Sequence, residues 1–189
     1  MSRAREFATC VLLLAIVIAA MVLRPTYDQK YAPIADRADS QTYRAGAYDV
    51  RIDDIRTTRL LGSEFGAGAD TSGLWLLVDM TFEAHEEPTR VPKLTIVNSD
   101  GVAWEASQRP GTTVGMPTGQ LSAGIPTHLV AIFELPPRAL DAGSTIALGG
   151  EVIAPVVTPE IPLGLTPARA RYLIAQPASS LVPDKVRFG

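Results

Sequence analysis

Cysteine is nearly absent from this chain of 189 residues, which contains only Cys10. A single cysteine cannot form a disulfide within the chain, so any folded domain must be stabilised by burial of apolar side chains. Cys10 also lies inside an apolar run. The lipid-modified cysteine of a bacterial lipoprotein follows its apolar run, so Cys10 does not fit that class.

Basic runs and catalytic motifs are missing as well. The chain has a net charge of −3 without a run of Lys or Arg, so we expect no binding to nucleic acid or to an anionic bilayer surface. The glycine-rich stretch Gly62–Gly73 lacks the Gly-Lys-Ser/Thr ending of a phosphate-binding loop. No Gly-x-Ser-x-Gly motif occurs, and only two histidines are present. We therefore expect neither an enzyme nor a cofactor-binding protein.

Two weak patterns of metal-ligating residues remain. His85-Glu86-Glu87 and His128 would supply two imidazoles and a carboxylate if the strand ends that carry them were neighbours. Asp53-Asp54 with Asp79 would offer oxygen ligands to Ca²⁺, but the spacing is not that of an EF-hand. Exposed polar residues at the margins of a sheet explain both patterns more simply, so no metal site is predicted.

The clearest feature that is present is the uncharged apolar run from Phe7 to Leu23. As a helix it would be roughly 26 Å long, close to the ~30 Å hydrocarbon core of a bilayer. Arginines before the run favour a cytoplasmic N-terminus. We predict a cytoplasmic tail over residues 1–6, a single transmembrane helix over 7–23, and a C-terminal part outside the cytoplasm.

A cleaved signal peptide is the alternative interpretation of the same run. No clear small-x-small cleavage site follows the apolar stretch, which favours an uncleaved anchor. In a membrane helix, the small side chains of Cys10, Ala15 and Ala19 would let a neighbouring helix approach closely, so they are candidate helix contacts.

Strands and turns dominate the prediction for the rest of the chain, which contains 15 glycines and 15 prolines. Residues 24–45 are polar without clear periodicity, and we interpret them as a stalk. Alternation of apolar and polar residues predicts strands at 47–55, 74–85, 93–97, 102–106, 127–135 and 144–148. Because no crossover helices separate these strands, they indicate an antiparallel β-sandwich over residues 46–150.

The strongest single pattern is the strand predicted at 74–85. One face is wholly apolar: Leu74, Leu76, Val78, Met80, Phe82 and Ala84. The other face begins with Trp75 and Leu77 and becomes polar toward His85, as in a half-buried antiparallel strand. Further along, Asn98-Ser99-Asp100-Gly101 predicts a hairpin turn with its glycine in the left-handed conformation.

Residues 151–189 are rich in proline but keep many apolar side chains. A disordered tail seldom carries so many apolar residues. We expect an extended segment that packs on the sandwich or on a partner, with residues 168–174 forming either a short helix or an edge strand.

The order of motifs in the middle of the chain resembles a known family. Its parts are Gly73–Phe82, Leu94–Gly101, Gly124–Pro126 and Phe133–Pro137. Together they resemble the telokin-like, immunoglobulin-fold extracellular domains of Gram-positive surface proteins, over roughly residues 47–149. The resemblance implies an immunoglobulin-like sandwich that is exported or membrane-anchored. It implies no enzymatic activity.

These observations together favour a membrane-anchored extracytoplasmic binding or accessory protein, a subunit or partner of a membrane or envelope complex such as a transporter. The alternative is a surface domain that binds glycan or lipid through Trp75, Trp104 and the Gly62–Gly73 stretch. Tyr172 and Leu173 are further candidate contacts with a ligand or partner.

Overall fold

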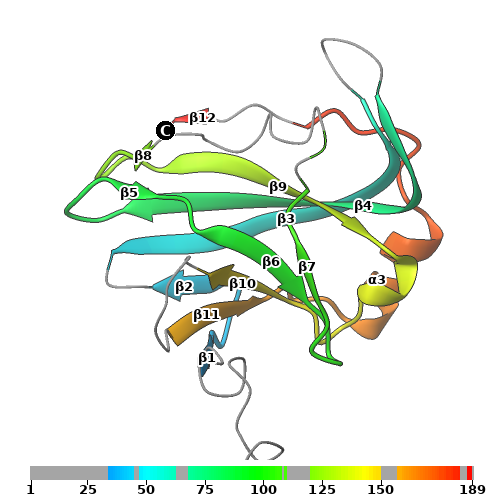
Figure 1. Cartoon of the computed structure of the whole chain (residues 1–189), viewed down its shortest axis with the longest axis horizontal. Helices are drawn as coiled ribbons and strands as arrows, with labels where there is room; N and C mark the ends of the chain where they lie inside the picture. Colours follow the sequence, from blue (N-terminus) through cyan, green and yellow to red (C-terminus); the bar gives the residue numbers. More distant parts are fainter. Residues whose placement is uncertain are drawn as a thin grey trace, which may run out of the picture. The chain divides into compact units, whose positions relative to one another are not determined.

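The computed structural model describes residues 34–44, 47–62, 68–107, 109, 120–149, 157–183 and 187–188. The chain divides into two compact units, 1–34 with 152–156 and 35–151 with 157–189. All described residues except Ile34 belong to the second unit, a β-sandwich (Figure 1). This architecture confirms the predicted antiparallel β-sandwich.

The predicted transmembrane helix over 7–23, with Cys10, Ala15 and Ala19, lies outside the described residues. Among the helices of the described residues, none has the length and apolar character needed to cross a bilayer.

Two five-stranded sheets and a small two-stranded one make up the fold. Sheet A runs in the order β1 (Ile34–Arg37), β11 (Val157–Pro162), β10 (Thr145–Gly149), β6 (Lys93–Val97) and β7 (Ala103–Glu105). Sheet B runs in the order β12 (Arg187–Phe188), β9 (Thr127–Leu135), β4 (Ala69–Ala84), β3 (Tyr48–Leu61) and β2 (Thr42–Arg44). Strands β5 (Thr89–Arg90) and β8 (Gln120–Leu121) pair separately, and the helical elements are the 3-10 turn η1 (Pro137–Ala139) and the helix α3 (Pro167–Ala175).

The central core is built from side chains of both sheets, and β4 contributes most to it. The apolar face predicted for this strand, from Leu74 to Ala84, is at most 1% exposed at every position. Leu94 and Ile96 of β6 and Ile146 of β10 join the same cluster. Burial of this apolar face is the main stabilising contribution, because no disulfide is available.

A second, smaller apolar cluster forms on the opposite face of sheet B. It contains Leu61, Trp75, Leu77, Val130 and Ile132, with Leu181 packed against it. Leu181 comes from the C-terminal residues 176–183, which we call the C-terminal strap. The predicted half-buried strand β4 is therefore buried on both faces in its middle, from Leu74 to Val78.

The strap is held by backbone hydrogen bonds to β3. Ala178 donates to the carbonyl of Thr57 at 2.8 Å, and Leu181 donates to that of Leu60 at 3.1 Å. Strand β2 pairs only with Asp49–Arg51 at the start of β3. The remaining edge of β3 would otherwise expose unpaired backbone groups, and the strap satisfies part of that edge.

Two strands are longer than predicted. β3 extends to Leu61 and contains a β-bulge at Asp53. Ile52 pairs with Met80 and Asp54 pairs with Asp79, so Asp53 is an extra residue in the pairing. Because this bulge shifts the alternation of inward and outward side chains by one residue, the second half of the strand does not continue the alternating pattern of the first half.

β4 begins at Ala69, so residues 69–73 of the glycine-rich stretch belong to this strand. Position 73 of β4 requires glycine, because a Cβ there would come within 2.4 Å of the Leu135 carbonyl oxygen.

The predicted stalk over 24–45 is wrong for residues 34–44, which supply β1 and β2 to the two sheets. These strands have four and three residues and little alternation, so their sequence carries no strand signal. The sandwich also extends beyond its predicted end at 150, since β11 and β12 belong to its sheets.

Of the two conformations expected for residues 168–174, the structure shows the helix, α3. Thr166 caps it, since its Oγ1 accepts a hydrogen bond from the Arg169 amide at 3.1 Å, and Pro167 occupies the first helical position. Ala170 and Leu173 face the core. The predicted hairpin turn is confirmed as well, with Gly101 at a φ of 77°.

Candidate functional site: the groove beside helix α3

The structure separates the four predicted contact residues into buried and exposed ones. Trp75 is 0% exposed and Leu173 is 4% exposed, so neither can contact a ligand in this conformation, and both assignments were wrong. Trp104 is half-buried and packs against the central core. Tyr172 is 50% exposed and is the one exposed residue of the four.

The surroundings of Trp75 show why it is structural. Its Nε1 donates a hydrogen bond to the Ala69 carbonyl at 3.0 Å. The guanidinium of Arg109 lies 5.2 Å from the ring centroid, and its Nη1 contacts Glu134 Oε1 at 2.9 Å. The ring is thus covered by a cation that is held by its own ion pair, and it is not free to stack on a sugar.

The two histidines lie at separate places along sheet B. His128 is paired in register with Thr81, and His85 lies four residues further along the chain, just beyond β4, or roughly 14 Å away at about 3.4 Å per residue. His85 Nε2 contacts Asp49 Oδ1 at 3.1 Å. They therefore cannot share a metal ion, and no group of three or more metal-ligating side chains occurs within the described part of the chain.

His128 belongs to a polar cluster that sequence reasoning missed. Its Nδ1 lies 2.8 Å from Thr81 Oγ1, which also donates to Asp53 Oδ2 at 2.5 Å. In a nucleophile–base–acid relay, the acid contacts the ring nitrogen that faces away from the nucleophile. Here Asp53 Oδ2 lies 3.9 Å from the same Nδ1. The cluster therefore does not have the geometry of a hydrolase triad.

All three carboxylates considered as calcium ligands are paired with arginines: Asp53 with Arg51, and Asp54 and Asp79 with Arg56. Arg56 Nη2 lies 2.8 Å from Asp79 Oδ1, and its Nε lies 3.7 Å from Asp54 Oδ2. The guanidinium occupies the position that a cation would take, so these carboxylates form an ion-pair cluster on the sheet.

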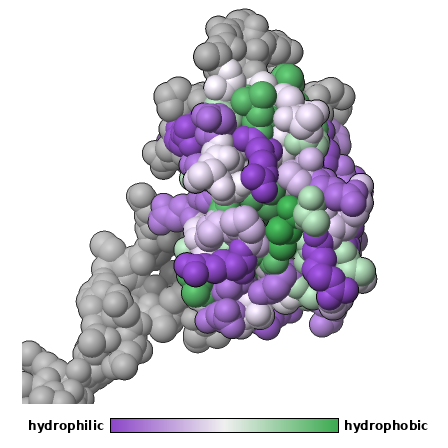
Figure 2. All heavy atoms as spheres, turned by 90° about the vertical axis from the view of Figure 1, so that its right-hand side faces the viewer, coloured by the Kyte–Doolittle hydropathy of each residue, from purple (hydrophilic) through white to green (hydrophobic). Residues whose placement is uncertain are grey.

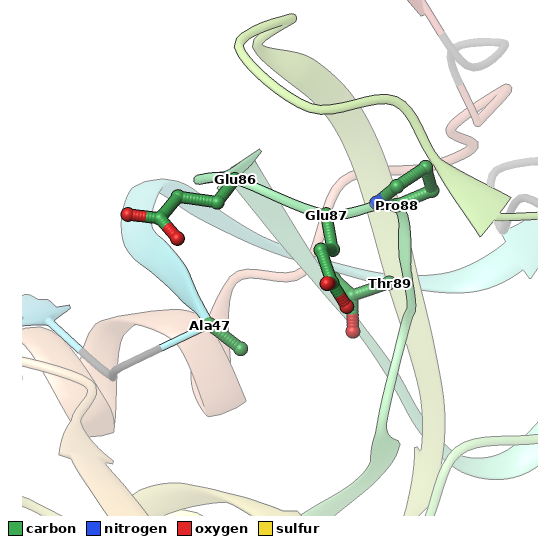
Figure 3. Close-up of a pocket in the computed structure, with 5 residues that line it drawn as sticks. All are labelled: Ala47, Glu86, Glu87, Pro88 and Thr89. Carbon is green, nitrogen blue, oxygen red and sulfur yellow. The ribbon is translucent and has the colours of Figure 1, made fainter.

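One hollow of about 270 Å³ is lined by Ala47 and by Glu86, Glu87, Pro88 and Thr89 (Figure 3). The carboxylates of Glu86 and Glu87 point in different directions there. They do not converge on a shared position, so we assign no ligand to this hollow.

A larger and more apolar groove of about 380 Å³ lies beside α3, and we call it the α3 groove. Three segments far apart in the sequence form it: the β6–β7 turn, the connection between η1 and β10, and the helix itself. Its lining is Ser99, Leu140, Asp141, Ala142, Gly143, Pro167, Ala170, Arg171 and Ile174. It therefore combines an apolar surface with few polar groups, the usual composition of a binding site.

Asp141 fastens two of the walls together. Its Oδ2 accepts hydrogen bonds from the Ser99 amide at 3.2 Å and the Ser99 hydroxyl at 2.8 Å. Its Oδ1 accepts from the Gly143 amide at 2.8 Å and the Ser144 hydroxyl at 3.2 Å. Burial raises the pKa of Asp141, but these hydrogen bonds from Ser99, Gly143 and Ser144 outweigh it and lower the pKa below its usual value. Both oxygens of the carboxylate are therefore hydrogen-bonded to the two loops, and these bonds fix the shape of the groove.

Helix α3 adds positive charge to the groove. Its sequence, PARARYLIA, contains two arginines and no acidic residue. Arg171 is exposed, lines the groove and makes no ion pair with the described residues. Arg169 lies over the exposed ring of Tyr172, with its Cζ 5.4 Å from the ring centroid. Figure 2 faces the end of the molecule that carries α3, where small hydrophobic areas alternate with hydrophilic ones.

Most groove residues had no sequence signal. The sequence Asp141-Ala142-Gly143-Ser144 is typical of an Asx turn, which predicts the local hydrogen bond from the Gly143 amide to the Asp141 carboxylate. Ser99 is distant in the sequence, and only the pairing of β6 with β10 brings it to Asp141. Arg171 resembles any surface arginine until the helix places it beside the groove.

Comparison with known proteins finds no matching family model and no significant match among curated proteins. Among solved structures, a secreted protein of Mycobacterium tuberculosis is 12% identical, with a TM-score of 0.48 over 68% of this chain and 97% of that chain. An uncharacterized β-sandwich protein from Clostridium difficile 630 is 6% identical, with a TM-score of 0.45 over 69% and 95%. YcdA from Bacillus subtilis is 15% identical, with a TM-score of 0.49 over 72% of this chain and 43% of that chain. Similarities of this size concern the sandwich and show neither a family nor an activity.

Proposed function

We propose that this chain is a membrane-anchored extracytoplasmic binding protein whose sandwich, immunoglobulin-like as in the telokin-like domains it resembles, binds a membrane or envelope protein through the α3 groove. The observation that carries the proposal is the groove itself, a preformed apolar surface with exposed arginine and tyrosine beside it. Tyrosine and arginine are the residues most enriched at the energetic centres of protein interfaces.

The shape and lining of the groove favour a protein partner over a small ligand. At about 380 Å³ it is near the lower limit of small-molecule pockets, which hold ~300–1,000 Å³ and enclose most of their ligand. The α3 groove is a shallow surface feature rather than an enclosed cavity. The glycan-binding alternative depended on Trp75, whose burial removes it from the surface. The role we propose is binding without catalysis.

The anchor is the second part of the proposal, and it depends on the apolar run from Phe7 to Leu23. Full-length protein should remain in the membrane pellet after extraction with alkaline carbonate, whereas a variant lacking residues 1–23 should be released. Release of the full-length protein would show that the run does not act as an anchor.

Co-purification tests the partner. Full-length protein with an N-terminal affinity tag, extracted from its native membranes in mild detergent, should elute with a second membrane or envelope protein in constant ratio. If the tagged chain eluted alone even when a crosslinker was added to the membranes before extraction, the binding role would be contradicted.

A further inference from the structure

The partner's contribution to the α3 groove can be described chemically. We propose that the groove binds an extended protein segment in which an aliphatic side chain lies next to a carboxylate. The aliphatic side chain would fill the apolar part of the groove, and the carboxylate would pair with Arg171. This inference rests on the proposed function and specifies the binding partner of the same site.

Charge complementarity carries the argument. Arg171 is the cation in the lining, and it makes no ion pair with the described residues. Asp141 is the anion in the lining, but four hydrogen bonds from Ser99, Gly143 and Ser144 hold both of its oxygens toward the loops. Among the described residues, Arg171 forms no ion pair with Asp141, so its guanidinium is available to a carboxylate of the partner.

The helix reinforces this preference for an acid. Arg169 is stacked on Tyr172, and no acidic residue of α3 offsets the two arginines. On the helix side of the groove an acidic segment would therefore meet two arginines and no acid, which favours it over a basic segment. The bidentate geometry of arginine suits a carboxylate in particular.

The apolar lining determines the second element of the segment. Leu140, Ala142, Pro167, Ala170 and Ile174 expose no hydrogen-bonding side chain to the groove. A polar side chain placed there would lose its water without compensation, so an aliphatic one is preferred. An acidic residue alone would leave this apolar surface exposed to water.

Selection from a random heptapeptide display library tests the proposal without assuming a sequence. The purified full-length protein in detergent is the bait. Matched baits carry Arg171→Glu in the groove, or Arg90→Glu on β5 at the other end of the sandwich in Figure 1. We expect the wild type and Arg90→Glu to select peptides with Asp or Glu beside an aliphatic residue. These peptides should bind Arg171→Glu at least ~10-fold more weakly, because a pair of opposite charges becomes a pair of like charges.

Three results would overturn this inference. The selected peptides could be neutral or basic, they could bind Arg171→Glu as well as the wild type, or no peptide could be selected. A concentration-dependent dimer that Arg171→Glu abolishes would assign the groove to a second copy of the chain, which also contradicts it. The three selection results leave the proposed function standing if a membrane protein still co-purifies with the chain. The dimer would also remove the α3 groove from that function, so the two failures are distinguishable.

Discussion

Single polar side chains join parts of this protein that are far apart in the sequence. The hydroxyl of Thr57, on β3, donates to the carbonyl of Leu173 near the end of α3 at 2.6 Å, and the bond is buried. This carbonyl belongs to the last turn of the helix, where backbone acceptors have no partner within the helix. Thr57 thereby fixes the helix that forms one wall of the groove.

Replacing Thr57 with valine should lower the free energy of unfolding by about 1–3 kcal/mol, because a buried carbonyl loses its donor while the side-chain volume is kept. Urea titration followed by circular dichroism measures the change. The matched variant is Thr95→Val on β6, where the described residues make no side-chain hydrogen bond to Thr95, and it should have little effect. Equal effects of the two variants would exclude a specific role for the Thr57 hydroxyl.

Asp141 gives the protein a defined response to acid. Because its pKa is lower in the folded state than in the unfolded chain, its stabilising contribution is complete above about pH 4 and is lost as the pH falls through the folded value. Asp141→Asn should cost about 1–2 kcal/mol at neutral pH, since an amide hydrogen would face donors that now bind an oxygen. The difference from wild type should shrink near pH 3.

Urea unfolding at pH 7 and pH 3 measures this difference. Asp100→Asn, an exposed change in the neighbouring hairpin turn, is the control and should follow the wild type at both pH values. A constant difference between Asp141→Asn and the wild type across this range would show that the carboxylate does not contribute through its charge.

At the level of the strands, close contact between β4 and β9 depends on a glycine. A Cβ at position 73 would lie 2.4 Å from the Leu135 carbonyl oxygen, which requires the two strands to separate. Gly73→Ala should therefore cost about 1–3 kcal/mol, as overpacking usually does. Gly149→Ala is the control, because its nearest neighbour would be the Lys93 carbonyl oxygen at 4.0 Å. Thermal unfolding compares the two, and equal midpoints would contradict the close approach.

The C-terminal strap is expected to protect the second apolar cluster. Leu181 is half-buried against Trp75 and its neighbours, whereas the adjacent Val182 is 49% exposed. Leu181→Ala should cost about 1–2 kcal/mol, less than truncation of a fully buried leucine, and Val182→Ala clearly less. Tryptophan emission during urea unfolding reports on this region. If Val182→Ala were the more damaging change, the described packing of the strap would be wrong.

Strands and turns were predictable from sequence where a local pattern of residues determines the structure. The apolar face of β4, the hairpin with Gly101 and the strand β9 follow from alternation and turn chemistry, and their predicted positions agree with the structure. β1 and β2 were assigned to a stalk because strands of a few polar residues are stabilised by pairing with neighbours, which leaves no periodic signal.

The candidate site was less predictable than the fold, for two physical reasons. Aromatic residues were selected for their chemistry, but burial depends on tertiary packing, and the strap with Arg109 covers Trp75. The α3 groove, in turn, is assembled by three segments whose proximity is set by sheet A and by Thr57. Of its residues, only the turn at Asp141 has a local sequence signature.

For the molecule as a whole, we propose an anchor, predicted from sequence, joined to a sandwich whose α3 groove binds a protein segment. The two parts make independent predictions. Carbonate extraction addresses residues 1–23, while peptide selection and the Arg171→Glu variant address the groove. A soluble protein that still selects acidic aliphatic peptides would retain the groove and reject the anchor.

Site-specific photo-crosslinking in native membranes shows whether the α3 groove contacts a partner protein. A photoreactive amino acid would replace Tyr172, beside the groove, or Arg90 on β5 as the control, in the full-length chain. We expect a discrete crosslinked product with another protein from position 172 and none from position 90. Products of the same size and yield from both positions, or from position 90 alone, would contradict the assignment of the α3 groove as the binding surface.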